Sequence, residues 1–328
     1  MRNLRKLLWA IPVLVVVYLA GTIWLPYYSL GPGPAREVQP LISVDGAPTY
    51  PSDGSFVLTS VLFEQLTAIG LLRAWLDPDR DVVSRTEVYA PGETREQERQ
   101  RSISQMDQSK LDATYVALEH LTGYPKEHGD GVLVESVVAE CAADGELYPG
   151  DLILEIDGEP VDTVREASKA IGAAPSGRTL TFDVTVDGEP ETVRLVREPC
   201  GGSQDPLVGV SLIPAFPFDV AITSDGIGGP SAGLMWALGL YDVLTPGDLT
   251  DARTIAGTGQ IGLNGRVYPI GGITEKLTAA ADAGASVFLV PKGNLEEARG
   301  ADTHGMELVP VGNFDDALAY LGEETVAA

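Results

Sequence analysis

The stretch Asp225-Gly-Ile-Gly-Gly-Pro-Ser-Ala-Gly-Leu-Met-Trp-Ala-Leu238 places small residues and a serine directly before an apolar run. Pro230 suits the first turn of a helix, because its missing N–H would have no partner there. We therefore expect Ser231 at a helix N-terminus, where free amides and the helix dipole stabilise an oxyanion. Serine is also a preferred N-cap, so this stretch alone leaves Ser231 open as a cap or as a nucleophile.

The same segment satisfies the G-x-S-x-G pattern of hydrolase nucleophile elbows, with Gly229, Pro230 and Ala232 around the serine. That pattern calls for a histidine later in the chain, and His304 is the one that follows. His304 lies in a segment typical of a surface turn. A histidine-dependent esterase that uses His304 is therefore kept as an alternative.

A buried lysine can replace histidine as the general base, because burial lowers the pKa of its ammonium toward neutrality. Beyond residue 206 the sequence has two lysines, Lys276 and Lys292. Lys292 lies between a proline and a glycine, which is typical of an exposed turn. Lys276 falls in the first turn of an expected helix, where the dipole disfavours a cation, and it is our candidate base.

These residues resemble the proteolytic domain of the Lon family over residues 206–322. The matching segments are residues 229–233, 255–276, 283–285 and 288–294. The resemblance implies that Ser231 is the nucleophile, Lys276 its general base and Thr258 a hydroxyl that orients the lysine. An ordinary strand or turn hydroxyl is the alternative for Thr258. Typical Lon proteases carry an acidic residue three positions before the serine, where this chain has Gly228.

From residue 131 the pattern changes to short strands separated by glycine-containing turns. Asp157-Gly158 and Asp187-Gly188 are strong hairpin signals, because both central positions of a type I′ turn need positive φ. The run Leu147-Tyr-Pro-Gly-Asp-Leu-Ile-Leu-Glu-Ile-Asp-Gly-Glu-Pro-Val161 and the strands around it resemble a PDZ domain of the bacterial, permuted type. The resemblance implies that an extended peptide end is bound as an added edge strand.

In a PDZ domain, backbone amides of one loop capture the carboxylate of the bound peptide. We expect this loop at Leu121, Thr122, Gly123 and Tyr124, directly before the first strand. An ordinary helix C-cap at Gly123 is the alternative, because glycine is the usual residue at that position.

The two cysteines of the chain, Cys141 and Cys200, do not have the spacing of a metal site. A disulfide between them and two separate buried thiols are both compatible with the sequence. We predict no metal and no cofactor.

The chain begins with the basic residues Arg2, Arg5 and Lys6. An uncharged run at residues 7–25 follows, which as a helix covers about 28 Å, close to the thickness of one bilayer core. We therefore predict an uncleaved single-pass anchor in the cell membrane, with the N-terminus cytoplasmic and the catalytic domain extracytoplasmic. A cleaved signal peptide is the alternative.

The composition of 44% hydrophobic and 21% charged residues is typical of a folded protein. The net charge of −25 argues against a nucleic-acid partner, because binding phosphates needs clustered Lys and Arg. The sequence has no G-x-x-x-x-G-K-[ST] phosphate loop, so we expect no use of ATP.

The predicted fold class is a multidomain α+β and α/β protein. It has a transmembrane helix at residues 1–28, a linker with a strand and helical segment at 29–120, a PDZ domain at 121–200 and a Lon-type α/β proteolytic domain at 206–328. The predicted function is a membrane-anchored, ATP-independent serine endopeptidase with a Ser–Lys dyad. Its PDZ domain would capture unfolded or extended segments of exported or membrane proteins. The resemblance implies a hexameric ring, and a catalytically inactive, membrane-tethered PDZ adaptor is the alternative function.

Overall fold

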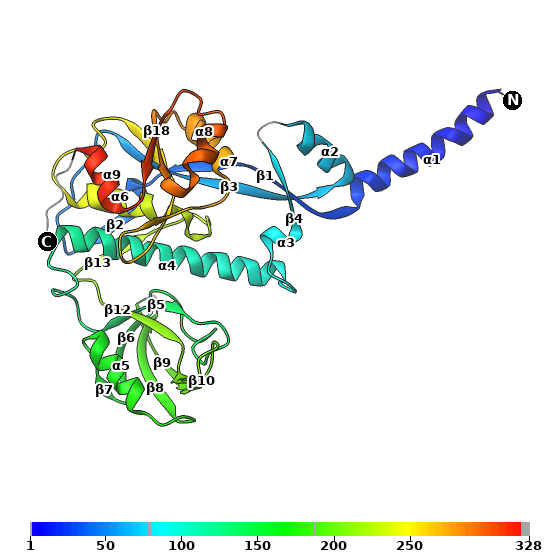
Figure 1. Cartoon of the computed structure of the whole chain (residues 1–328). Helices are drawn as coiled ribbons and strands as arrows, with labels where there is room; N and C mark the ends of the chain where they lie inside the picture. The colour runs from blue at the N-terminus through cyan, green and yellow to red at the C-terminus, as the bar shows by residue number, and fades with distance from the viewer. Residues whose placement is uncertain (1, 78–79, 187, 323–328) are drawn as a thin grey trace.

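A computed structural model describes residues 2–77, 80–186 and 188–322 of the chain (Figure 1). Its strands and helices form a large unit and a small unit, with helix α4 (Arg95–Leu121) along the boundary between them. The small unit comprises residues 122–214, and the large unit contains the strands and helices on both sides of it in the chain. An arm that ends in helix α1 extends from the large unit.

The large unit is built on a six-stranded sheet in the order β18-β17-β14-β3-β1-β4. Its strands are β1 (Trp24–Glu37), β3 (Ser55–Thr67), β4 (Asp81–Ser84), β14 (Thr254–Gly257), β17 (Val287–Pro291) and β18 (Glu307–Val311). Strands β3, β14, β17 and β18 run parallel to one another, whereas β1 is antiparallel to β3 and β4. Strands from before and after the small unit therefore form a single sheet.

Helices cover this sheet and complete the hydrophobic core. Helix α6 (Gly233–Leu244) packs between the sheet and α4, and Trp236 at its centre is fully buried. Helix α7 (Ile273–Asp282) packs against β1 and β3. Every residue of β17 is buried, as expected for an inner parallel strand covered on both faces. The remaining elements are β2 (Ile42–Asp45), β13 (Asp219–Ile222), β15 (Gln260–Ile261), β16 (Val267–Tyr268), η1 (Gln39–Leu41), η2 (Pro230–Ala232), η3 (Lys292–Asn294), α8 (Leu295–Gly300) and α9 (Phe314–Leu321).

Helix α4 begins at a capping box, in which the Thr94 hydroxyl accepts from the Gln97 amide and the Gln97 side chain accepts from the Thr94 amide. The first turns are polar and mostly exposed, and from Met106 onward the helix buries an apolar face that includes Val116 and Ala117. Burial of each large apolar side chain contributes about 1.5 to 3 kcal/mol, so the second half anchors the helix to the core.

The small unit has a sheet in the order β12-β5-β6-β8-β9, with β7 paired to β6, and one helix, α5. Its elements are β5 (Val132–Val137), β6 (Leu152–Ile156), β7 (Glu159–Pro160), α5 (Val164–Ala173), β8 (Thr179–Val186), β9 (Glu189–Val196), β10 (Glu198–Pro199), β11 (Pro206–Leu207) and β12 (Val210–Pro214). Asp157 and Gly158 have φ of 53° and 78°, which are the positive values that a type I′ turn requires. Asp187, in the other expected turn, lies outside the described residues. The sheet extends to Pro214, beyond the boundary that the sequence suggested at residue 200.

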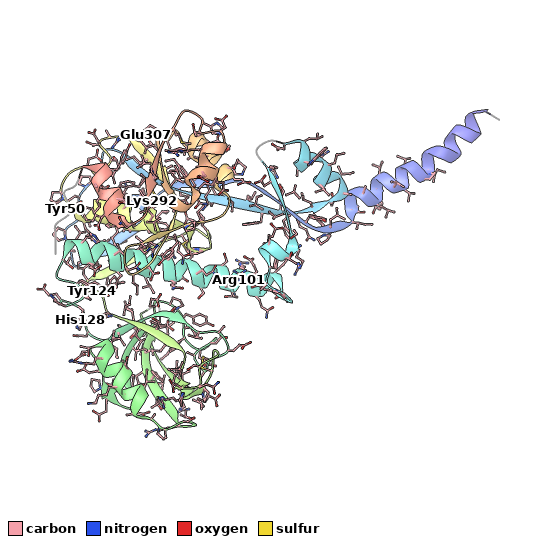
Figure 2. The ribbon with its side chains drawn as sticks, in the orientation of Figure 1. Tyr50, Arg101, Tyr124, His128, Lys292 and Glu307 are labelled. Atoms are coloured by element: carbon pink, nitrogen blue, oxygen red, sulfur yellow. A yellow bond between two sulfur atoms is a disulfide. The ribbon has the colours of Figure 1, made fainter. Side chains whose placement is uncertain are left out.

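The chain enters and leaves the small unit at one place. Tyr124, after the end of α4, donates its hydroxyl proton to the carbonyl of Pro214 at 2.8 Å. The ring of Tyr124 also packs against Tyr115 of α4 and against Phe216, and Figure 2 shows it between the two units. This aromatic contact joins the two connecting segments at the junction.

The N-terminal arm corrects the prediction of a membrane anchor. Helix α1 (Arg2–Thr22) ends before the uncharged run does, because Trp24 already pairs with Thr67 in the β1–β3 ladder. The uncharged part of the helix then covers about 24 Å, short of a bilayer core of about 30 Å. Within the described part of the chain, no helix is long and apolar enough to cross a membrane. The predicted single-pass span at residues 1–28 and the cell-membrane location derived from it are therefore wrong. The arm also carries α2 (Ala68–Leu76) and α3 (Arg85–Val88).

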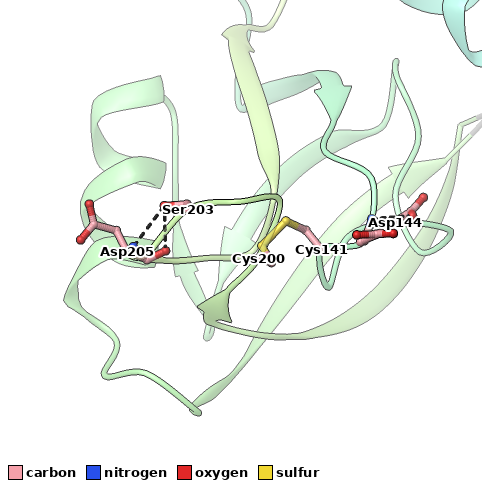
Figure 3. The surroundings of a disulfide bond; sticks show 6 residues. Cys141, Asp144, Cys200, Ser203 and Asp205 are labelled. Carbon is pink, nitrogen blue, oxygen red and sulfur yellow. Dashed lines mark hydrogen bonds between the residues drawn. A yellow bond between two sulfur atoms is a disulfide. The ribbon is translucent and has the colours of Figure 1, made fainter.

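Cys141 and Cys200 form a disulfide in the small unit (Figure 3). The bond links the turn after β5 to the end of β10, next to the start of β12. Gly209 packs directly on it, since a Cβ at this position would lie 2.1 Å from the Cβ of Cys141. The φ of Gly209 is also +88°, so a larger residue there would be strained. The disulfide and Gly209 together fix the entry into strand β12.

Candidate active site

Ser231 lies in the short turn that leads into helix α6. Gly229 has a φ of +81°, and the 3-10 turn Pro230–Ala232 follows it, so the chain bends sharply before the helix begins at Gly233. Ser231 is partly exposed, and it lies in the turn directly before the first residue of the helix. This position leaves its hydroxyl accessible to a substrate carbonyl.

Lys276 reaches Ser231 from helix α7. Its side chain is 2% exposed, and Nζ lies 2.8 Å from the Ser231 Oγ and 2.8 Å from the Thr258 Oγ1. Thr258, which follows β14 and is 1% exposed, donates its own hydroxyl proton to the carbonyl of Ser231 at 3.0 Å. The three side chains therefore form a closed network in which each hydroxyl holds the amine in place.

The electrostatics of this network favour a neutral amine. Burial alone lowers the pKa of Lys276 from 10.5 to about 7. The adjacent Glu275 is 1% exposed, and burial raises the pKa of its carboxyl. A lysine with a pKa near 7 is a free base in a large fraction of molecules at neutral pH. It can then accept a proton from the hydroxyl 2.8 Å away.

Backbone contacts hold Ser231 from two sides. On one side its carbonyl accepts from the Gly259 amide at 2.8 Å, in addition to Thr258. On the other side the Ser109 Oγ donates to the carbonyl of Pro230 at 3.0 Å, and the amide of Gly229 donates to the Ser102 carbonyl at 2.8 Å. The peptide units around Ser231 are thereby fixed between β14 and α4.

Ser102 and Ser109 were not among the residues that the sequence pointed to. They lie two turns apart on one face of α4, in a segment whose polar composition is typical of a solvated surface. Ser109 is nevertheless 2% exposed. The spacing of the two serines was the one signal in the sequence that they share a face, and it does not say what that face contacts.

Close packing explains the small residues of the turn. A Cβ at Gly233 would lie 2.9 Å from the Ile261 amide nitrogen and 2.9 Å from the Ser109 Oγ. A Cβ at Gly228 would lie 2.3 Å from the Ser102 Oγ. The position where typical Lon proteases carry an acidic residue is thus filled here by the Ser102 hydroxyl, and a side chain at residue 228 would require Ser102 to shift.

The other candidate bases lie elsewhere. His304 has a φ of 51° in an exposed turn, and its ring contacts the Thr278 Oγ1 at 3.4 Å and Asp302 at 3.9 Å. The Lys292 side chain, labelled in Figure 2, is 60% exposed, and its Nζ pairs with the Asp316 carboxylate at 2.7 Å. Among the described residues, neither His304 nor Lys292 has a hydrogen bond to Ser231. The same part of the chain holds no cluster of His, Cys, Asp or Glu suited to a metal ion.

The small unit has a groove of about 260 Å³ between helix α5 and the edge strand β12. Its lining includes Val164, Ser168 and Ile171 from α5, Arg197, and the segment at residues 206–210 that leads into β12. The outer edge of β12 has no strand partner in the described structure. An apolar groove beside a free strand edge is suited to binding an extended peptide.

Leu121, Thr122, Gly123 and Tyr124 are not among the residues that line this groove. Leu121 is the last residue of α4, and Thr122 caps the helix by donating its hydroxyl proton to the Leu118 carbonyl at 2.9 Å. Tyr124 is 3% exposed in the junction described above. The four residues therefore form a helix end and a packed turn.

Two family models match this chain: residues 219–321 match the Lon protease (S16) C-terminal proteolytic domain, and residues 114–196 match the PDZ domain. A Lon protease of Lachnoclostridium phytofermentans is 42% identical over 95 residues, 28% of this chain and 12% of that protein. A Lon protease of Rickettsia felis is 27% identical over 181 residues, 54% of this chain and 20% of that protein. This chain carries a Lon-type proteolytic domain and a PDZ domain.

The chain spans a small part of the length of these curated relatives. The PDZ domain of an SdrC-like protein from Listeria monocytogenes aligns with 26% of this chain and 88% of its own length, at 28% identity and a TM-score of 0.24. The small unit is the PDZ domain, and the large unit contains the Lon-type domain. Strands β1 and β3 lie before the matched range of the Lon-type domain, yet they belong to the same sheet.

Proposed function

We propose that the protein is an ATP-independent serine endopeptidase in which Ser231 is the nucleophile and Lys276 the general base. The observation that carries this proposal is the 2.8 Å contact between the Ser231 Oγ and the Nζ of a fully buried lysine. A Lon-type proteolytic domain around these residues supports it. The absence of a phosphate-loop motif from the sequence supports independence from ATP.

The reaction would begin when the Ser231 Oγ attacks a peptide carbonyl and transfers its proton to the Lys276 Nζ. The oxyanion that forms would be stabilised by backbone amides of the turn that carries Ser231. The Lys276 ammonium would then protonate the leaving amine, and water would hydrolyse the acyl-enzyme with Lys276 as base again. Thr258 would orient the amine through its hydrogen bond, and Ser109 would position the nucleophile by holding the Pro230 carbonyl.

The PDZ domain would supply the substrate by binding an extended segment in the groove between α5 and β12. Addition of a strand to the free edge of β12 would satisfy the peptide backbone, and the apolar lining would accept alternate side chains. Arg197 lines the same groove, and its positive charge suits a terminal carboxylate. We place carboxylate capture at residues 206–209 instead of residues 121–124. The proposed substrates are therefore polypeptides with flexible or unfolded ends.

The test is cleavage of an unstructured protein such as casein by the full chain without nucleotide. Wild type should cleave, Ser231→Ala and Lys276→Ala should not, and His304→Ala should cleave like wild type. An inactive adaptor predicts no cleavage by wild type or by any variant. A histidine-dependent esterase predicts that His304→Ala loses activity and that Lys276→Ala keeps it. A hexameric ring stays a prediction, which light scattering on the purified chain would test.

A further inference from the structure

Helix α4 contacts the PDZ domain through a cluster of carboxyl groups. The Gln108 Nε2 donates to the Glu135 Oε1 of strand β5 at 2.6 Å. Asp112, one turn further along the helix, faces the same Glu135 carboxylate. Gln108 is next in sequence to Ser109, which holds the carbonyl of Pro230. Neighbouring residues of α4 thus contact the PDZ domain and the turn that carries Ser231.

Both acidic groups of this cluster are buried. Asp112 is 5% exposed and Glu135 is 7% exposed. Glu135 accepts two hydrogen bonds, from Gln108 and from the Ser136 Oγ at 2.7 Å, which suits an ionised carboxylate. The Oδ1 of Asp112 has no hydrogen-bond partner among the described residues. Two adjacent buried carboxylates cannot both be charged without a large cost, because neither has a cation beside it.

Among the described residues, the charged groups of the elements packed on α4 do not compensate the pair. On α4 itself, Lys110 pairs with Asp107 at 3.0 Å. The elements that pack most extensively against α4 along its length are α6, η2, β5 and β15. Glu135 is the one titratable residue of β5, and β15 and η2 contain none. Helix α6 contributes Tyr241 and Asp242, and Asp242 accepts from the Gln39 side chain and the Leu249 amide.

We propose that Asp112 and Glu135 share one proton, and that this proton fastens the PDZ domain to α4. Asp112 is the protonated partner, because Glu135 already accepts two hydrogen bonds and has no need of a proton to satisfy them. The neutral carboxyl of Asp112 then faces the Glu135 carboxylate as a hydrogen-bond donor. Docking of the PDZ domain therefore takes up a proton when the undocked Asp112 is ionised.

The direction of the pH effect follows from this linkage. Burial and the Glu135 carboxylate raise the pKa of Asp112 from 3.8 to about 8 in the docked structure. When the PDZ domain swings away, Asp112 meets water and its pKa returns toward the ordinary value. The docked state binds more protons between these two values, so docking is tightest in acid and weakens by up to about tenfold per pH unit. Above about pH 8 the docking equilibrium no longer changes.

Docking of the PDZ domain on α4 also affects the turn that carries Ser231, because the same helix contacts that turn. Ser102 and Ser109 of the same helix hold Gly229 and Pro230 beside the nucleophile. Release of the PDZ domain would expose the face of α4 that carries Gln108 and Asp112, and would remove one of the contacts that fix this part of the helix. A proton at Asp112 would therefore couple substrate capture to the geometry at Ser231. This coupling goes beyond the proposed peptidase activity, and its test does not depend on that activity.

The test is amide hydrogen exchange in the full chain, read on α4 and β5 between about pH 5 and pH 8 and corrected for intrinsic rates. In wild type, protection of amides at the α4–β5 contact should fall by up to about tenfold per pH unit. In Asp112→Asn the amide side chain still donates to Glu135, so protection should stay high and constant. Asp107→Asn is the matched control on the same helix and should keep the wild-type slope. A flat wild-type profile, or the same slope in Asp112→Asn, would overturn the proposal.

A second measurement covers the case in which Asp112→Asn does not fold. Infrared spectra of the wild type near neutral pH should contain the C=O stretch of a protonated carboxyl group that disappears above about pH 8. Glu135→Gln should shift the loss of this band to lower pH, because the neighbouring negative charge is gone. Absence of the band from wild type, or a band with the same midpoint in Glu135→Gln, would show that the two groups do not share a proton.

Discussion

The side chains of Lys276 and Asp112 are both buried, but the groups beside them differ in charge. Both side chains are buried without a partner of opposite charge, and burial moves the pKa of each toward neutrality, to about 7 for Lys276 and about 8 for Asp112. Lys276 has two neutral hydroxyls beside it, whereas Asp112 has a second carboxylate. Near pH 7 the amine is therefore partly deprotonated, whereas the carboxyl group is still largely protonated.

This difference gives the two regions opposite responses to pH. Rising pH activates the proposed base and at the same time loosens the contact between α4 and the PDZ domain. The proposed base becomes neutral above about pH 7, and docking of the PDZ domain reaches its weakest level above about pH 8. Substitutions at Lys276, at α4 and in the PDZ groove can separate the two regions.

The largest effect is expected from Lys276→Met, which fills the same volume with an apolar side chain. Loss of the general base should lower kcat/KM for an unstructured protein substrate by about 10²- to 10⁴-fold. The fold should be kept, because a buried cation is replaced by an apolar group. Lys292→Met, at the exposed lysine paired with Asp316, is the control and should keep full activity. Equal losses in both variants would remove Lys276 from the mechanism.

Wild-type activity should depend on pH through the same amine. Below about pH 7 the rate should rise roughly tenfold per pH unit and then level off as Lys276 becomes neutral. The folded pKa lies below the unfolded value of 10.5, so the unfolded state binds more protons between them. Stability against urea should therefore rise with pH from about 7 to 10.5 in wild type relative to Lys276→Met. A rate that is flat from pH 5 to 8 would contradict the lowered pKa of Lys276.

Ser109→Ala should reduce kcat by roughly tenfold with little change in KM. The substitution leaves the Pro230 carbonyl buried without its donor, which costs about 1 to 3 kcal/mol and allows the nucleophile turn to shift. Ser104→Ala is the matched control, because Ser104 lies on the same helix and makes no side-chain hydrogen bond to the turn among the described residues. A purely structural role for Ser109 would lower the fraction of folded protein and leave the kcat of the folded fraction unchanged, so active-site titration separates the two outcomes.

A smaller effect is expected when the groove of the PDZ domain is filled. Ser168 is exposed on α5 and lines the groove, so Ser168→Trp should block a bound peptide without disturbing the core. KM for a long substrate should rise several-fold while kcat for a short peptide stays the same. Lys169→Trp, at the next and equally exposed position, lies outside the groove and serves as control. Weaker binding in both variants alike would place the peptide site elsewhere.

The smallest effect is expected from His304→Ala. Its ring contacts Thr278 and Asp302 in a surface turn, and nothing in the described structure connects it to Ser231. Activity toward proteins and toward simple esters should agree with wild type within a factor of about two, as is usual for surface substitutions. Loss of esterase activity alone would revive the histidine-dependent mechanism.

Helix α4 and the segments that carry Ser231 and Lys276 differ in how far the sequence predicts their roles. Ser231 and Lys276 were accessible to sequence reasoning because a nucleophile, its glycines and a lysine in an apolar helix start are properties of short segments. Ser109 and Asp112 were not, because the polar segment around them is typical of a solvated face. They become buried when α4 packs on α6 and β5, and those contacts join residues far apart in the chain.

The peptide groove and the N-terminal arm also depend on contacts between segments that are distant in the sequence. The sequence placed the carboxylate loop at residues 121–124 because a glycine there precedes the first strand. The structure instead forms a groove from α5 and β12, and residues 206–210 lead into it. Hydropathy gave the apolar run at residues 7–25, but pairing of Trp24 with Thr67 decided where the helix stops. The composition of one segment does not specify which strand will pair with it.

The sequence by itself determined the chemistry that we propose for this protein: a serine at a helix start, a candidate lysine base, the PDZ pattern and the lack of a phosphate loop. Each depends on residues that are close in the chain or on a local motif. The tertiary structure alone decided that strands from both ends of the chain share one sheet around the PDZ domain. It also decided that α4 lies between Ser231 and Glu135, and that Lys276 and Asp112 lose their water. Burial and charge proximity arise from packing of distant segments, and they set the two pKa values on which the proposed function and its control depend.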